Sequence, residues 1–134
     1  MIFFDTGAWV ALAVPTDRNA PAATQLYQEV ARGVHGAVVT TSFVLDEATS
    51  LIRSLTDVDN ATRFVRTLLR DPSLIVIWVH SEHFASGLDI FESARDKRWS
   101  LTDCTSFAVM RQLGITKAFS FDHNFEQAGF ERLP

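Results

Sequence analysis

Apolar residues along the chain follow two alternating patterns. Short apolar runs rich in β-branched and aromatic side chains predict buried strands, and they lie at residues 1–4, 37–40, 74–79 and 118–121. Between these runs, apolar residues recur three and four positions apart, which predicts helices that place one face on a core. The helical stretches begin near residues 6, 20, 42, 59, 81, 102 and 125.

Local signals refine these elements. Ser42, Asp59 and Thr102 each precede an amphipathic stretch, and side-chain oxygens in such positions cap helix starts. Residues 74–79 are apolar without interruption, which predicts a strand covered on both faces. The helix after it is expected to place three large side chains in the core: Phe84, Leu88 and Phe91.

The alternation of strands and helices predicts an α/β fold. Helices that connect parallel strands cover both faces of the sheet, so we expect a three-layer α/β/α sandwich around a central, twisted and mainly parallel sheet. The chain has 134 residues, of which 47% are hydrophobic, and one cysteine. It is therefore expected to form a single domain over residues 1–134 without disulfides. Ligands of such sheets bind at the carboxyl ends of the strands.

The charge of the chain restricts how it meets nucleic acid. Its formal net charge is −4, whereas proteins that bind phosphate backbones usually carry excess Lys and Arg. Local basic clusters are expected to make such contacts, although a solvated charged face is the simpler interpretation. Two clusters qualify: Arg63, Arg66 and Arg70, and Arg95, Lys97 and Arg98. No stretch is long enough to span a bilayer, and the start lacks a signal peptide's basic residues, so the expected compartment is the cytoplasm.

Four acidic residues stand near expected carboxyl ends of strands or in the first turns of helices. Asp5 and Asp122 each end an apolar run, and Glu47 and Asp103 lie early in predicted helices. Each has a structural alternative, because acids also form turns, cap helices and stabilise helix starts. For Glu47 the alternative is a solvated helix face.

Together, the four acids point to a metal. Carboxylates that converge on one edge of a sheet repel one another unless a divalent cation neutralises them, and oxygen ligands suit Mg²⁺ or Mn²⁺. A bound metal activates water and stabilises charge on phosphate oxygens, which is the chemistry of phosphodiester hydrolysis.

The motifs that contain these acids resemble those of PIN-domain nucleases of the VapC type. They are Phe4-Asp5-Thr6, the helix-borne Glu47, Ser100-Leu101-Thr102-Asp103, Phe121-Asp122-His123-Asn124-Phe125 and Gly129-Phe130. The resemblance runs from end to end and implies a PIN-like sandwich and a Mg²⁺- or Mn²⁺-dependent endoribonuclease.

The resemblance also assigns residues and partners. It implies Asp5, Glu47 and Asp103 as the core metal ligands, with Asp122 completing the acidic pocket, and it favours Glu47 over the adjacent Asp46. Thr6 and Asn124 are expected to contact substrate, with capping of the first helix as the equally favoured alternative for Thr6. The implied partners are RNA, a VapB-type antitoxin of a type II toxin–antitoxin system, and a second copy of the chain in a homodimer.

Three other interpretations compete. A haloacid-dehalogenase-type phosphatase requires a second Asp two residues after the first, where this chain has Gly7. A receiver domain requires a carboxylate after its third strand, where this chain has Val79-His80-Ser81. A catalytically silent PIN-like module that binds RNA or protein remains the alternative from a different functional class.

Overall fold

The computed structural model describes all of residues 1–134 and contains one five-stranded sheet. All strand pairs are parallel, in the order β3-β2-β1-β4-β5. The strands are β1 (Ile2–Phe4), β2 (Val38–Thr41), β3 (Leu74–Ile77), β4 (Lys117–Phe119) and β5 (Glu131–Leu133). The short β5 was not predicted, because it has only three residues and none of them is fully buried, which leaves too little alternation to recognise.

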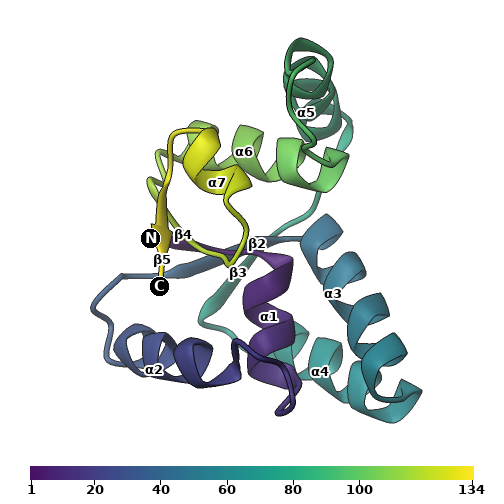
Figure 1. Cartoon of the computed structure of the whole chain (residues 1–134), viewed down its shortest axis with the longest axis vertical. Coiled ribbons are helices and arrows are strands. Elements are labelled where there is room, and N and C mark those ends of the chain that lie inside the picture. The colour runs from purple at the N-terminus through teal and green to yellow at the C-terminus, as the bar shows by residue number, and fades with distance from the viewer.

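Helices cover both faces of the sheet, so the predicted α/β/α sandwich is confirmed. In Figure 1, α5, α6 and α7 lie above the sheet, and α1, α2 and α4 lie below it. The helices are α1 (Thr6–Ala13), α2 (Ala20–Ala31), α3 (Ser42–Leu55), α4 (Val58–Arg70), α5 (Ser81–Ser93), α6 (Leu101–Leu113) and α7 (Asn124–Gln127). None of them is both long and apolar enough to cross a membrane.

Aromatic side chains hold the layers together around the central strand. Phe3 and Phe4 of β1 are fully buried; Phe4 packs against Trp9 and Phe119, each with a centroid separation of 4.7 Å. The Trp9 indole N–H donates to the Thr40 hydroxyl, which donates to the backbone carbonyl of Phe4. These contacts fix α1 against β1 and β2, and so fix the start of α1 at the carboxyl edge of the sheet.

The expectation that residues 74–79 are covered on both faces is wrong. β3 is an edge strand that pairs only with β2, and Ile75 and Trp78 are 40% and 56% exposed. The next helix, α5, packs chiefly on α6 and stands away from the sheet (Figure 1). The side chains of Phe84, Leu88 and Phe91 are consequently exposed rather than in the core.

Three helix starts differ from their predicted caps by one or two residues. Thr41, Asp57 and Ser100 accept hydrogen bonds from backbone N–H groups of α3, α4 and α6, in place of the expected Ser42, Asp59 and Thr102. Each sequence offers two polar residues near the boundary, and the extended backbone before the helix selects the earlier one. The Ser42 hydroxyl accepts instead from the Val79 N–H, which ties α3 to the segment that follows β3.

Candidate active site

A cavity of about 420 Å³ opens at the carboxyl edge of the sheet. Asp5 follows β1, Asp122 follows β4 by three residues, and Glu47 and Asp103 lie in the early turns of α3 and α6. All four carboxylates line the cavity, as do Thr6 and Asn124. The other lining residues are Gly7, Leu51, Arg98, Ser100 and Phe121. The fold therefore brings together side chains up to 119 positions apart in the chain, from Asp5 to Asn124.

Asp5 is the most buried of the acids, with 6% of its surface exposed. Its Oδ2 accepts a hydrogen bond of 2.8 Å from the Ser120 hydroxyl. Burial raises the pKa of Asp5 to about 7, and the charges of Asp103 and Asp122 act in the same direction, although the Ser120 hydrogen bond opposes them. A cation bound beside Asp5 would offset this cost, because it would stabilise the ionised carboxylate.

Asp103 joins the cavity to the start of α6. The Ser100 hydroxyl accepts from the Asp103 N–H, and Asp103 Oδ2 accepts from the Ser100 N–H, both at 3.0 Å. This reciprocal capping fixes the side chain at the helix start. Partial burial raises the pKa of Asp103, and the nearby Asp122 and Glu47 add to the rise. Asp103 therefore caps the start of α6, and its carboxylate also faces the other acids.

The Asn124 amide links two of the acids. Its Nδ2 donates to Asp103 Oδ2 at 3.0 Å and to Asp122 Oδ2 at 3.2 Å. Asp122 in turn accepts from the Asn124 backbone N–H at 2.9 Å, which closes the turn before α7. Asn124 thus sets the spacing of two carboxylates that would otherwise repel each other.

Glu47 faces the cavity and Asp46 does not. Glu47 accepts a hydrogen bond of 2.6 Å from the Thr6 hydroxyl, whereas Asp46 lines a separate cavity with Val65, Leu69 and Trp78. Adjacent helix positions point about 100° apart, so only one of the pair turns toward the carboxyl edge of the sheet.

Ser120 was not predicted as a site residue. Its hydroxyl donates to Asp5 and accepts from the Asp122 N–H at 3.0 Å, and it is fully buried. It therefore connects the first and the last acid of the chain. The sequence does place a hydroxyl two residues before Asp122, near a strand end. This pattern did not single out Ser120, because such hydroxyls are also frequent in ordinary turns.

The donor chemistry of the cavity fits a hard divalent cation. Carboxylate oxygens are the ligands that Mg²⁺ and Mn²⁺ prefer. No three acidic, His or Cys side chains gather closely enough to enclose an ion by themselves. Mg²⁺ normally keeps several waters and binds proteins through one or two carboxylates together with substrate phosphate. A partly hydrated ion therefore fits the open arrangement of these acids.

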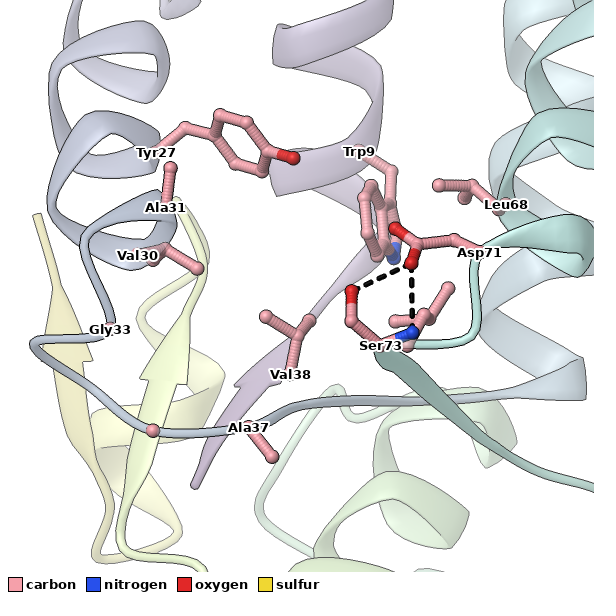
Figure 2. Close-up of a pocket in the computed structure, with 12 residues that line it drawn as sticks. Trp9, Tyr27, Val30, Ala31, Gly33, Ala37, Val38, Leu68, Asp71 and Ser73 are labelled. Carbon is pink, nitrogen blue, oxygen red and sulfur yellow. Dashed lines mark hydrogen bonds between the residues drawn. The ribbon is translucent and has the colours of Figure 1, made fainter.

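A second cavity, of about 250 Å³, lies at the opposite edge of the sheet, where β2 and β3 begin. Figure 2 shows its mainly apolar lining, including Trp9, Tyr27 and Val38. Its one carboxylate, Asp71, accepts from the N–H and hydroxyl of Ser73, which lowers the pKa of Asp71. The single carboxylate of this cavity is already hydrogen-bonded within a local turn, so the cavity lacks the group of carboxylates that could bind a metal ion at the carboxyl edge.

Residues 2–131 match the family model of the PIN domain, so the chain belongs to the PIN-domain family. The chain is 30% identical to the 23S rRNA-specific endonuclease VapC20 of Mycobacterium tuberculosis over an aligned length of 137 residues. The alignment covers 97% of this chain and 95% of that protein. The crystal structure of M. tuberculosis VapC20, described as a sarcin–ricin loop cleaving toxin, matches with a TM-score of 0.88 at 29% identity. That match covers 97% of this chain and 96% of the other. These findings confirm the resemblance to VapC-type toxins expected from the motifs.

Proposed function

We propose that the protein is a metal-dependent endoribonuclease and the toxin of a type II toxin–antitoxin pair. The observation that carries this proposal is the gathering of Asp5, Glu47, Asp103 and Asp122 around one cavity in a chain of the PIN-domain family. The similar VapC20 is named as an endonuclease specific for 23S rRNA. We therefore propose RNA as the substrate and 23S rRNA as the first RNA to test.

Mg²⁺ or Mn²⁺ is the proposed cofactor, with Asp5, Glu47 and Asp103 as ligands and Asp122 completing the set. When bound, such an ion supplies a water of lowered pKa as nucleophile and stabilises charge on the phosphate oxygens. Ser120 and Thr6 orient Asp5 and Glu47 through the hydrogen bonds described above. Thr6 and Asn124, which line the same cavity, are the proposed substrate contacts.

The proposed partners are a VapB-type antitoxin and a second copy of the chain. An open cavity with four carboxylates suits a basic side chain from an antitoxin segment, which would take the place of the cation. The exposed apolar face of α5, formed by Phe84, Leu88 and Phe91, supports a homodimer, since exposed apolar patches mark protein interfaces. RNA and antitoxin together indicate the cytoplasm as the site of action.

The test is cleavage of RNA by the purified protein, freed of any copurifying antitoxin. Total RNA and intact ribosomes are incubated with Mg²⁺ or Mn²⁺, with EDTA as the metal-free control, and the cut ends are mapped by sequencing. We expect discrete cuts with either metal and none with EDTA. Asp5→Asn should lower the cleavage rate at least about a hundredfold, because it removes a charged ligand of the ion.

Asp59→Asn is the matched control for Asp5→Asn. Asp59 is exposed in the first turn of α4, so this variant loses the same charge outside the cavity and should cleave like the parent. Unchanged cleavage by Asp5→Asn would contradict the site assignment. If the parent makes no cuts with either metal, the silent binding module becomes the better account.

A further inference from the structure

Arg98 is the one basic residue that lines the acidic cavity. The sequence offered two basic clusters as candidates for phosphate contacts, and the structure separates their members. Arg63, Arg66 and Arg70 lie on α4, below the sheet in Figure 1. Arg95 and Lys97 belong to the same connection as Arg98, between α5 and α6, but line other cavities. Of the six basic residues, only Arg98 lines the same cavity as the four carboxylates.

The Arg98 guanidinium has no partner in the protein. Lys97 pairs with Asp96 at 3.4 Å and Arg132 pairs with Glu126 at 3.0 Å, whereas Arg98 takes part in no ion pair and donates no side-chain hydrogen bond to another residue. The acids of the cavity accept instead from Thr6, Ser100, Ser120 and Asn124. The five N–H donors of Arg98 therefore remain available to an anion from outside.

The chain around Arg98 is held firmly in place. The next residue, Trp99, packs edge-on against Phe107 with a centroid separation of 5.1 Å and donates from its indole N–H to Gln127. Ser100 then caps α6 together with Asp103. On the other side of the connection, Gly87 lets α5 approach α6 closely, because a Cβ there would lie 2.9 Å from the Thr105 backbone.

Electrostatic repulsion explains why a nuclease would need a positively charged side chain beside this cavity in addition to a metal ion. One divalent ion neutralises only half of the charge of four ionised carboxylates, so the cavity would still repel an approaching phosphodiester. A guanidinium at the rim offsets part of that repulsion and, through its planar fork, binds two phosphate oxygens at once.

We propose that Arg98 is a substrate-binding residue that grips a phosphate of the RNA backbone and so holds the strand over the acids. This inference rests on the proposed function, since it requires RNA to enter the cavity. It selects one residue from six candidates and predicts a contact that does not depend on base identity, because phosphate carries no sequence information.

The test compares Arg98→Gln, Arg95→Gln and Arg32→Gln, which lose the same charge at different places. Arg32 caps the end of α2 before the connection to β2, at the opposite edge of the sheet, and should bind and cleave RNA like the parent. Affinity is measured by anisotropy with Mn²⁺ at several salt concentrations, on a fluorescein-labelled RNA hairpin chosen because the parent does not cut it, as gel electrophoresis verifies. Cleavage and Mn²⁺ binding are measured separately.

We expect Arg98→Gln to weaken RNA binding about tenfold and to reduce the slope of log affinity against log salt by about one. Arg98→Lys should recover part of the affinity. Mn²⁺ affinity should stay the same or rise, because a positive charge near the ion is lost. Arg95→Gln should weaken binding less than Arg98→Gln. Since Arg98 is exposed, the melting temperature should not change.

The outcomes separate this inference from the proposed function. Normal RNA affinity and salt slope in Arg98→Gln, with a parent that cleaves, would overturn the contact and keep the nuclease. Weaker binding in Arg98→Gln, with a parent that does not cleave, would keep the contact and overturn the nuclease. An equal loss of affinity in Arg95→Gln would show general attraction by the segment and would also overturn the assignment to Arg98.

Discussion

Without a metal ion, the buried carboxyl group of Asp5 lowers the stability of the folded protein when it is ionised. Its carboxyl group is buried, and its pKa is raised from 3.8 to about 7. Between these two values the folded protein holds a proton that the unfolded chain releases. Linkage then requires the free energy of unfolding to fall as pH rises through this window and to level off above about pH 7. Asp103, whose pKa is also raised, acts in the same direction.

Replacing the Asp5 charge should therefore remove most of this pH dependence. In EDTA we expect the parent to be less stable at pH 8 than at pH 5, by an amount on the order of a few kcal/mol. Asp5→Asn keeps an oxygen acceptor for Ser120 and should be the more stable protein at pH 8. Urea unfolding at both pH values measures the effect.

Asp59→Asn is the control for this measurement as well, and it should keep the pH dependence of the parent. A decline in stability from pH 5 to pH 8 that is equally large in Asp5→Asn would contradict the assignment of the raised pKa to Asp5.

The candidate residues were predictable where chemistry and position agreed. Asp5 and Asp122 follow apolar runs, so their place at one edge of a parallel sheet could be inferred. Ser120 could not, because its importance lies in a contact with Asp5 across 115 positions of sequence. The preference for Glu47 over Asp46 came from family resemblance, and the hydrogen bond from Thr6 shows which one faces the cavity.

At the scale of elements, the start of α6 combines structure and chemistry. Ser100 and Asp103 cap the helix through reciprocal hydrogen bonds, and the same bonds aim the Asp103 carboxylate at the cavity. The two interpretations of Asp103 that the sequence left open are thus compatible.

α5 leads to a prediction about assembly. Phe84, Leu88 and Phe91 are 41%, 44% and 48% exposed on a helix that packs chiefly on α6. We expect this face to meet a second copy of the chain. Leu88→Asp should then shift the protein from dimer to monomer, because a buried unpaired carboxylate opposes association. Light scattering after size exclusion measures the mass.

Val34→Asp is the comparison for α5. Val34 is 62% exposed in the connection between α2 and β2, outside the proposed interface, and its replacement should leave the mass unchanged. A parent that is already monomeric, or a Leu88→Asp variant that stays dimeric, would contradict the role of this face.

Apolar periodicity predicted which of the main segments are strands and which are helices, but it did not predict which elements pack against one another. The strand 74–79 reads as buried because its residues are apolar, yet β3 lies at the edge of the sheet. The periodic apolar residues of α5 read as a core face for the same reason. Periodicity reports which side chains avoid water and does not report whether the same chain or another one covers them.

At the scale of the whole molecule, the order of the parallel strands in the sheet brings the acidic residues together. Parallel strands bring their carboxyl ends to one edge, and the order β3-β2-β1-β4-β5 places β1 beside β4, so that Asp5 and Asp122 lie close together. The sandwich was predictable from the alternation of elements, whereas this strand order was not, because local sequence does not state which strands pair. The match to VapC20 at a TM-score of 0.88 shows the same architecture in a toxin.

The most direct test of the central claim is the chemistry of the cut ends. A metal-activated water as nucleophile leaves the neighbouring ribose 2′-hydroxyl without a role. An RNA with a single 2′-deoxy substitution at the nucleotide before the cut should therefore still be cleaved in Mn²⁺, and mass spectrometry of the products should find no 2′,3′-cyclic phosphate. Cyclic phosphate ends, with cleavage abolished by the 2′-deoxy substitution, would contradict the account, because they would make the RNA's own hydroxyl the nucleophile.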